Sequence, residues 1–523
     1  MKRRSKLRAS ASASAIAAVA ALGLTATAET TQAQTVERTG TGQVLIFPYY
    51  TVNDDWVTTI NVTNTSDSTL AVKFRLRESK NSRDVLDFTV VFSPYDVWTA
   101  WLQQDPDTGA TQIFTNDNSC TSPVKSVVNG ATANPIAYSG SQADGGGSGL
   151  GRLRDGYVEM LVMGEAPVVD ITAANGGYTQ GTVPYNAWHI NGIPEDCAAV
   201  DSAFIATDVW DQTSDLTGRN GTPDAALDFE APTSNPLKGN VSWLKLGTGA
   251  GAGSTALAVS DWAQGNLVTA QEFPWFLEPT FVTNATPWSL NTAALTTFED
   301  AINVESAFNE WASVTSTGAV TEWVLTFPTK AYHVDKFNDQ IQAAVSKYRY
   351  ALKDVVTCDS DALADRGSCI DNINAVPLAP FTNLFSVLTD GVEPLGDSPV
   401  LVTYTFFDRE EEGVETTTGD TSISPAPPPE IQEAALRYEA NVVQFGPSSA
   451  LGSNKAAIID DTLLPVGAVN GWGKVTFGAD PTAPVPLPAV GFAVKVRDQG
   501  DPGSAYGQAM DHGYSIPAAA AAN

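Results

Sequence analysis

Histidine and cysteine, the side chains behind most metal centres and nucleophilic sites, are scarce in this chain of 523 residues. It has four cysteines and three histidines, His189, His333 and His512. The histidines are so far apart that no local motif such as H-E-x-x-H exists, and the G-x-S-x-G turn that presents a serine nucleophile is absent. A Ser-His-Asp site or a histidine metal centre would therefore have to be assembled by the fold.

Basic side chains are also few, with 29 Lys and Arg against 59 Asp and Glu and a net charge of -30. A phosphate polymer would meet a strongly negative surface, so binding to nucleic acid is not expected. Apolar residues at 43% and aromatic residues at 9% are typical of a folded chain rather than a disordered acidic one.

The first 28 residues have the pattern of an export signal. Five basic residues lie within positions 2–8, small and apolar residues follow from 9 to 27, and Ala26-Thr27-Ala28 offers a cleavage site. No later stretch reaches 18 apolar residues, so the mature chain is expected to have no spanning helix. Cleavage would remove five basic residues and no acidic ones, which changes the net charge to -35. We expect an extracellular or cell-surface protein, with the periplasm as the alternative.

The four cysteines predict two disulfides in such an oxidising compartment. Cys358 and Cys369 are close in sequence and form the nearer pair, which leaves Cys120 to pair with Cys197. Metal ligation is the alternative, but the C-x2-4-C spacing with nearby histidine is missing.

Three carboxylates inside the predicted Cys358–Cys369 loop form a candidate calcium site. Asp359, Asp361 and Asp365 crowd oxygen ligands into a short closed loop, although the order of an EF-hand loop is not met and Arg366 adjoins the third. Calcium is the one cofactor that the sequence suggests.

Period-two alternation over residues 44–104 predicts half-buried antiparallel strands. The expected fold is mainly β: an antiparallel β-sandwich, immunoglobulin-like in its N-terminal module, with a few helices in the middle of the chain. Helices are expected over 291–313 and 334–356, where apolar residues recur at helical spacing. The expected strands cover 44–50, 56–63, 72–76, 86–92, 157–163, 241–246, 320–327, 402–406, 442–445, 473–477 and 490–496.

Changes in composition suggest the order of the domains. Glycine is dense over 139–151, and a proline-rich connector begins at 424. The expected parts are the signal peptide (1–28), an N-terminal β-sandwich module (29–138), a glycine-rich loop (139–151), a mixed β/α central region (152–423) and a C-terminal β region (424–523).

One short segment is basic in this acidic chain. It contains Lys73, Arg75, Arg77, Lys80 and Arg83, and the first three point to one face of a strand. The simpler interpretation is a solvated face that keeps an edge strand from pairing. The alternative is a binding patch for acidic partners, such as envelope phosphates, acidic glycans or a second copy of this chain.

Three further patterns leave their interpretation open. Trp98 and Trp101 are suited to stacking on sugars, although their apolar neighbours favour core packing. The glycine-rich stretch 247–253 has no lysine or following helix to make a phosphate loop, and a hairpin loop is favoured. The abundant carboxylates allow a glycosidase-like pair without pointing to one.

Five segments of the chain, in this order, carry a resemblance to known sequences: 44–50, 93–98, 323–330, 407–411 and 438–442. They resemble a group of exported proteobacterial proteins labelled as cell-surface proteins, to which no function is assigned. The resemblance extends over most of the mature chain. It implies an envelope or extracellular location in a Gram-negative bacterium and no catalytic residue.

These patterns together predict a non-enzymatic exported protein that acts by binding or assembly. Its partner would be an envelope or extracellular component, or a second copy of the chain. The alternative is a secreted carbohydrate-active hydrolase that uses an Asp/Glu pair.

Overall fold

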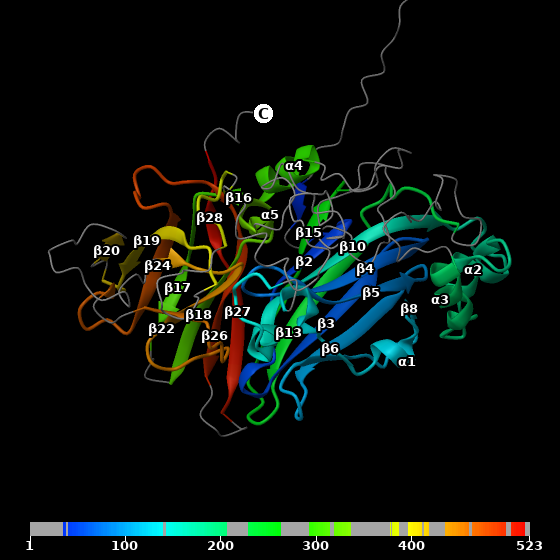
Figure 1. Cartoon of the computed structure of the whole chain (residues 1–523), viewed down its shortest axis with the longest axis horizontal. Helices are drawn as coiled ribbons and strands as arrows, with labels where there is room; N and C mark the ends of the chain where they lie inside the picture. Colours follow the sequence, from blue (N-terminus) through cyan, green and yellow to red (C-terminus); the bar gives the residue numbers. More distant parts are fainter. Residues whose placement is uncertain are drawn as a thin grey trace, which may run out of the picture. The chain divides into compact units, whose positions relative to one another are not determined.

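Antiparallel strands dominate the part of the chain that the structure, a computed structural model, describes (Figure 1). The predicted class, mainly β with few helices, is confirmed. All described residues belong to one unit, Ala33–Asn523, and the predicted signal peptide lies outside them. The described residues are 35–37, 40–139, 143–206, 228–262, 292–313, 318–335, 377, 379–385, 396–410, 413–417, 435–459, 463–497 and 504–517.

Sheet 1 has seven strands in the order β1-β15-β2-β10-β4-β5-β8. Its central strands β2, β10 and β4 are buried along almost their whole length, because other layers cover both faces of the sheet. The strands are β1 (Thr35–Glu37), β2 (Val44–Thr51), β4 (Ser68–Glu78), β5 (Asp84–Phe92), β8 (Cys120–Ser122), β10 (Asp155–Pro167) and β15 (Leu257–Ser260).

Sheet 2 has six strands in the order β14-β13-β3-β6-β7-β9 and packs face to face on sheet 1. The ring of Phe74 on β4 lies 4.8 Å from that of Phe88 and 5.8 Å from that of Trp98 on β6, between ring centroids. These contacts form the core of the N-terminal sandwich. The strands are β3 (Trp56–Asn64), β6 (Val97–Gln104), β7 (Thr111–Phe114), β9 (Ala131–Thr132), β13 (Leu237–Lys245) and β14 (Gly251–Thr255).

Sheets 3 and 4 form a second sandwich. Sheet 3 has the order β20-β19-β24-β17-β28, with β21 also paired to β19, and sheet 4 has the order β23-β22-β18-β26-β27. Trp323 of sheet 4 packs edge-on against Phe406 of sheet 3 in their shared core. The strands are β17 (Ser306–Ala312), β18 (Ala319–Thr326), β19 (Val400–Phe407), β20 (Gly413–Thr417), β21 (Ala435–Leu436), β22 (Ala440–Phe445), β23 (Ala457–Ile459), β24 (Asn470–Phe477), β26 (Val490–Arg497), β27 (Tyr506–Asp511) and β28 (Gly513–Ser515).

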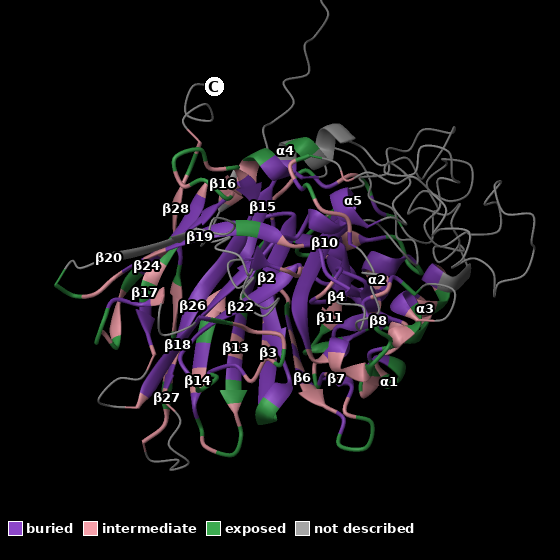
Figure 2. Cartoon of the chain, turned by 60° about the vertical axis from the view of Figure 1, so that its left-hand side comes forward, coloured by how far each residue is buried: buried purple, intermediate pink, exposed green. Residues whose placement is uncertain are grey.

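The central strands of sheet 4, β22, β18 and β26, are largely buried on both faces, which joins the two sandwiches. Along β18, Trp323 faces the core shared with sheet 3, whereas Val324 belongs to the core of the N-terminal half. Phe492 of β26 stacks on Trp243 of sheet 2, with 4.7 Å between ring centroids. Every residue of β18 is therefore buried, as the continuous purple of this strand illustrates (Figure 2).

Helices are short, and none among the described residues is long and apolar enough to cross a membrane. The α-helices are α1 (Lys125–Val128), α2 (Val183–Ala187), α3 (Cys197–Ala206), α4 (Thr292–Ile302) and α5 (Lys330–Val334), and the 3-10 turns are η1 (Asn53–Asp55), η2 (Pro135–Tyr138), η4 (Leu150–Arg154) and η5 (Ala174–Gly177). Two small ladders pair β11 (His189–Ile190) with β12 (Ile193–Pro194), and β16 (Asn303–Val304) with β25 (Leu487–Pro488).

The helix predicted over 291–313 is only half right. Helix α4 ends at Ile302, and the chain continues as strands β16 and β17. Strand β17 bonds to β24 on one side and β28 on the other, and this pairing outweighs the helical spacing of its apolar residues. Apart from Val334 and Asp335, the helix predicted over 334–356 lies outside the described residues.

The predicted domain borders do not separate the sheets. Sheet 1 includes β10 and β15, and sheet 2 includes β13, so the N-terminal sandwich needs residues up to Ser260 rather than ending near 138. Sheet 3 likewise combines β19 and β24 from opposite sides of 424. Glycine-rich and proline-rich composition indicates where connections between strands lie. It does not indicate which strands pair, because pairing depends on the tertiary fold.

Candidate functional site

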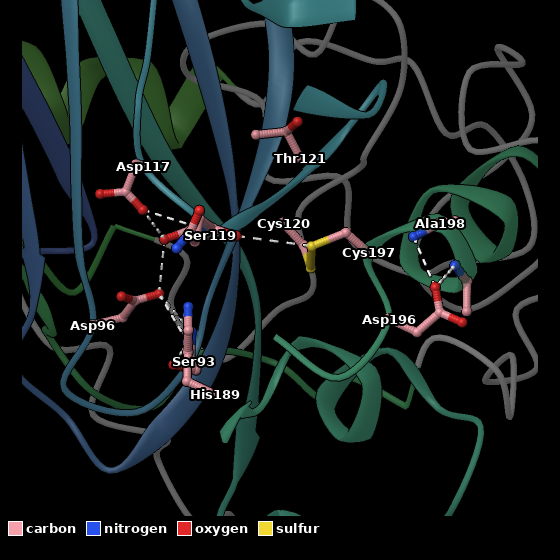
Figure 3. The surroundings of a disulfide bond; sticks show 12 residues. Ser93, Asp96, Asp117, Ser119, Cys120, Thr121, His189, Asp196, Cys197 and Ala198 are labelled. Carbon is pink, nitrogen blue, oxygen red and sulfur yellow. Dashed lines mark hydrogen bonds and ion pairs between the residues drawn. A yellow bond between two sulfur atoms is a disulfide. The ribbon is translucent and has the colours of Figure 1, made fainter. Parts of the chain in front are cut away.

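The disulfide between Cys120 and Cys197 confirms the longer of the two predicted pairings (Figure 3). The Cα atoms are 5.0 Å apart, and the bridge spans 77 residues of sequence. Cys120 begins the edge strand β8 and Cys197 begins α3, so the bond fastens the segment that carries α2, β11 and α3 to sheet 1. Cys358 and Cys369 lie outside the described residues.

The calcium candidates Asp359, Asp361 and Asp365 also lie outside the described residues, so their site stays a prediction. Within the ranges that are described, no group of three or more His, Cys, Asp or Glu side chains is placed to hold a metal ion.

A serine, a histidine and an aspartate meet close to the disulfide, although far apart in sequence (Figure 3). Ser93 Oγ is 2.6 Å from His189 Nδ1, and Asp96 Oδ2 is 3.8 Å from the same nitrogen. A catalytic triad needs the serine and the carboxylate on opposite ring nitrogens, so that the imidazole relays a proton between them. Ser93 is moreover buried. This cluster is a structural tie between β11 and the turn after β5.

The basic segment from Lys73 to Arg83 is largely buried, whereas the sequence predicted an exposed strand face. Lys73, Arg75, Arg77 and Arg83 are at most 4% exposed, and half-buried Lys80 donates to the carbonyl oxygen of Gly146. Both interpretations assumed an exposed strand face, and both are wrong. Strand β4 is not an edge strand, because it lies between β10 and β5, and its second face is covered as well.

Carboxylates on the two neighbouring strands neutralise these cations. Arg75 lies opposite Asp87 of β5 and Glu159 of β10 in the ladder register. Arg77 Nε donates to Glu159 Oε1 at 2.6 Å, and Lys73 forms an ion pair with Asp87. Burial raises the pKa of Asp87 to about 6, with Lys73 opposing the rise.

The network continues through the turn after β4. Arg152 of η4 donates to both Glu78 and Asp144, at 2.7 Å and 2.8 Å. Burial opposes ionisation, but Arg152 holds the pKa of Glu78 and of Asp144 below their usual values. Arg83 reaches Asp335 after α5 at 3.1 Å, which links the N-terminal sandwich to the C-terminal half. We call these buried groups the ion-pair network: Lys73, Arg75, Arg77, Glu78, Arg83, Asp84, Asp87, Asp144, Arg152, Glu159 and Asp335.

A second buried pair lies beside this network, at the start of α5. Lys330 Nζ donates to the carbonyl oxygen of Tyr438 at 3.1 Å, and Ser82 Oγ donates to Glu439 Oε2 at 3.2 Å. Burial lowers the pKa of Lys330 and raises that of Glu439, each to about 8. Ser82 belongs to the N-terminal sandwich and Glu439 to the C-terminal half, so the hydrogen bond between them connects the two halves.

One sequence signal could have revealed the network. Glu159 is a single charge inside an apolar strand, Tyr157 to Met163, where an unpaired carboxylate would be costly. A buried acid requires a buried cation, and the densest basic segment after residue 28 runs from Lys73 to Arg83.

The outer face of sheet 2 is the exposed feature that stands out. Each strand alternates, with Ile60 and Val62 of β3 pointing inward while Thr59, Asn61 and Thr63 point outward. We call ten outward residues with amide, hydroxyl or stacked aromatic side chains the polar face. Its residues are Thr59, Asn61, Thr63, Thr99, Trp101, Gln103, Gln112, Phe114, Asn240 and Ser242. The same outer side of the sheet also has the exposed side chains of Val97, Lys238 and Leu244.

The ladder register places seven of these ten side chains in two rows across the sheet. One row reads Phe114, Trp101, Thr59, Ser242 from β7 to β13. The other reads Thr99, Asn61, Asn240. Within the described part of the chain, the side chains of Asn61, Thr99 and Asn240 form no hydrogen bond. Their donors and acceptors are therefore open to a ligand.

Trp98 and Trp101, the two tryptophans considered for sugar stacking, differ in burial. Trp98 is fully buried in the sandwich core, as its apolar neighbours suggested. Trp101 is half-buried on the polar face, where its ring stacks on Phe114 with 5.5 Å between centroids and 16° between planes. Its Nε1 donates to Gln103 Oε1 at 3.0 Å, which fixes the ring.

A hollow of about 440 Å³ adjoins the end of the rows at β13. Asn240 and Ser242 belong to both the polar face and the hollow, and Asp511 of β27 lies on the far side. The glycine-rich stretch 247–253 forms the β13–β14 hairpin next to it, so the predicted hairpin is confirmed. Besides Asn240 and Ser242, the lining consists of Val241, Gly253, Ser254, Thr255, Ala509 and Asp511.

Fold and site together define a mainly β protein of stacked antiparallel sheets with an open polar face and buried ion pairs. A comparison with protein-family models, curated proteins and solved structures finds no match for the chain. The resemblance to exported cell-surface proteins stays a prediction from the sequence.

Proposed function

We propose that this chain is an exported, non-enzymatic protein that acts at the cell surface or in the extracellular space by binding a partner through its polar face. The observation that carries the proposal is the pair of uncharged rows, whose Asn61, Thr99 and Asn240 side chains have no hydrogen bond of their own among the described residues.

Two further observations support this reading. The disulfide Cys120–Cys197 is of the kind that persists in oxidising compartments. Ser93, Lys330 and Glu439 are buried, His189 is half-buried, and the contacts of these side chains connect elements of the fold.

Export is tested by producing the full chain with its leader in a Gram-negative host and fractionating the cells. We expect the chain outside the cytoplasm, with mass spectrometry placing its N-terminus after Ala28. Intact protein found only in the cytoplasm with its leader retained would contradict the proposal.

Binding is tested with the purified mature chain against envelope fractions and washed cells. Thr99→Arg places a long charged side chain in the second row and should abolish retention. Thr405→Arg is the matched control, because Thr405 is a half-buried strand residue on the outer face of sheet 3. No retention of the unmodified chain, or equal retention of both variants, would overturn the proposal.

A further inference from the structure

We infer that the ligand of the polar face is a neutral carbohydrate, which lies across the strands of sheet 2 from the Trp101–Phe114 stack to the hollow beside β13. This inference rests on the proposed function and names the chemical class of its ligand.

The aromatic end of the face suits the apolar side of a sugar ring. Trp101 and Phe114 are direct cross-strand neighbours, so their rings stack on the outward side of an antiparallel ladder. The hydrogen bond from Trp101 to Gln103 fixes the indole before a ligand arrives, which reduces the entropy lost on binding. The C–H groups of a pyranose can pack on such a partly exposed aromatic surface.

The polar rows suit the hydroxyl groups of the same ligand. Asn61 and Asn240 each offer both an amide donor and a carbonyl acceptor, and Thr99 has a hydroxyl that does both. A sugar hydroxyl is likewise donor and acceptor. Five neighbouring strands, from β7 to β14, span roughly 19 Å at about 4.8 Å per step, which is the length of several sugar rings.

Charge favours a neutral ligand over the alternatives. The two rows carry no charged residue, whereas the exposed Lys238 lies beside them, opposite Thr63 and two positions from Asn240, and Asp511 lines the hollow. An anionic polymer would find no cluster of cations there, because the segment from Lys73 to Arg83 is buried. A protein partner would be expected to need an apolar centre, whereas the middle of this face consists of Thr59, Asn61 and Thr99.

A second stacked pair provides an internal control. Phe407 and Trp472 stack on the outer face of sheet 3, with 4.5 Å between ring centroids. Glu310 and Phe407 lie opposite Trp472 on its neighbouring strands, and Arg409 bonds to Asn470 nearby. This pair is also stacked face to face, but its surroundings are charged.

The test is affinity gel electrophoresis of the mature chain in gels that contain a neutral polysaccharide: mixed-linkage β-glucan, galactomannan or dextran, each in turn. We expect at least one of them to retard the chain. Trp101→Ala and Asn61→Asp should each raise the apparent Kd at least tenfold, while Trp472→Ala changes it less than twofold. Thermal unfolding midpoints show whether the variants are folded. No retardation by any of the three, or retardation that both face variants keep, would overturn the inference.

A parallel measurement separates this inference from the proposed function. The envelope fraction is oxidised with periodate, which cleaves vicinal diols, before the mature chain is added. Loss of binding supports a carbohydrate ligand. Binding that survives periodate but is abolished by Thr99→Arg would leave the proposed function intact and disprove the ligand class, and absence of binding before oxidation would disprove both.

Discussion

The guanidinium of Arg77 and the carboxylate of Glu159 form an ion pair at 2.6 Å in the interior of sheet 1, where both side chains are buried. They lie on the adjacent strands β4 and β10, and Arg77 also donates to the carbonyl oxygen of Ser82 at 2.9 Å. The pair is thus held by the sheet on one side and by the β4–β5 turn on the other. Buried charges placed this way constrain which strands pair and in which register, because a shifted register would leave each charge without its partner of opposite sign.

Breaking this pair is expected to be costly. Arg77→Met leaves Glu159 without this partner in a buried position, and about 3–5 kcal/mol of stability should be lost. Replacing both residues, as Arg77→Met with Glu159→Leu, should cost much less than the sum of the single changes. Urea unfolding of the three variants measures this. As a control, Glu310→Gln removes one member of the exposed pair with Lys495 and should cost at most about 1 kcal/mol.

Stability should decrease as pH rises from about 5 to 7, and Glu322 should account for part of the change. Burial raises the pKa of Glu322 to about 7, against opposing hydrogen bonds such as that from the Leu451 amide. The folded state therefore holds a proton that the unfolded state releases above its own lower pKa, and the stability linked to it is lost through this range.

Glu322→Gln keeps an acceptor for the Leu451 amide but cannot ionise. Its urea midpoint should fall less between pH 5 and 7 than that of the unmodified chain. Asp87, with its pKa raised to about 6, and Glu439, with its pKa raised to about 8, contribute in the same direction and remain in both proteins. An identical slope with and without Glu322 would contradict the assignment.

Removing the disulfide should loosen one part of the chain before the rest. The double variant Cys120→Ser, Cys197→Ser leaves Cys358 and Cys369 untouched, unlike a chemical reductant. Opening a bridge across 77 residues costs up to about 4.5 kcal/mol by loop entropy. Limited proteolysis with mass spectrometry should show early cleavage between α2 and α3. Protection equal to that of the unmodified chain would show that the bond from Ser93 to His189 and local packing hold the segment alone.

Gly491 should not tolerate a side chain. It lies opposite Leu325 in the ladder between β26 and β18, and a Cβ atom there would overlap the carbonyl oxygen of Val324. Gly491→Ala is expected to cost about 1–3 kcal/mol, since the strands must move apart. Gly247→Ala, in the β13–β14 turn with open space around it, is the control and should change the unfolding midpoint little.

Much of the sandwich was predictable from local patterns. The alternation over 56–63 corresponds to β3, because a strand that is covered on one face shows its two faces in its residues. The segment 86–92 forms β5 as expected, but residues 88–92 are all buried, so the alternation there did not mark a solvent face. The pairing of Cys120 with Cys197 followed from the count and spacing of the cysteines. The helix expected over 291–313 failed after Ile302, because hydrogen bonds from both neighbours hold β17 in the sheet.

The candidate site could not be predicted from such local patterns. Thr59, Asn61, Thr99 and Asn240 have no distinctive local spacing, and they form two rows only because β13 pairs with β3 from almost 180 residues away. In the sequence, the apolar neighbours of Trp101 favoured a core position. In the structure, its side chain points outward because it alternates with the buried residues of β6.

The sequence by itself determined the class of fold and the direction in which each strand's side chains alternate, because these depend on neighbours a few positions apart. The tertiary structure decided which of those faces meet water. Alternation distinguishes two faces but does not say what covers each. In the sequence, Lys73, Arg75 and Arg77 have the pattern of a solvated face. In the folded sheet, the adjoining strands place Asp84, Asp87 and Glu159 next to them. Only the complete sheet, with its second layer in place, makes them part of the interior and leaves the uncharged rows of sheet 2 as the open surface.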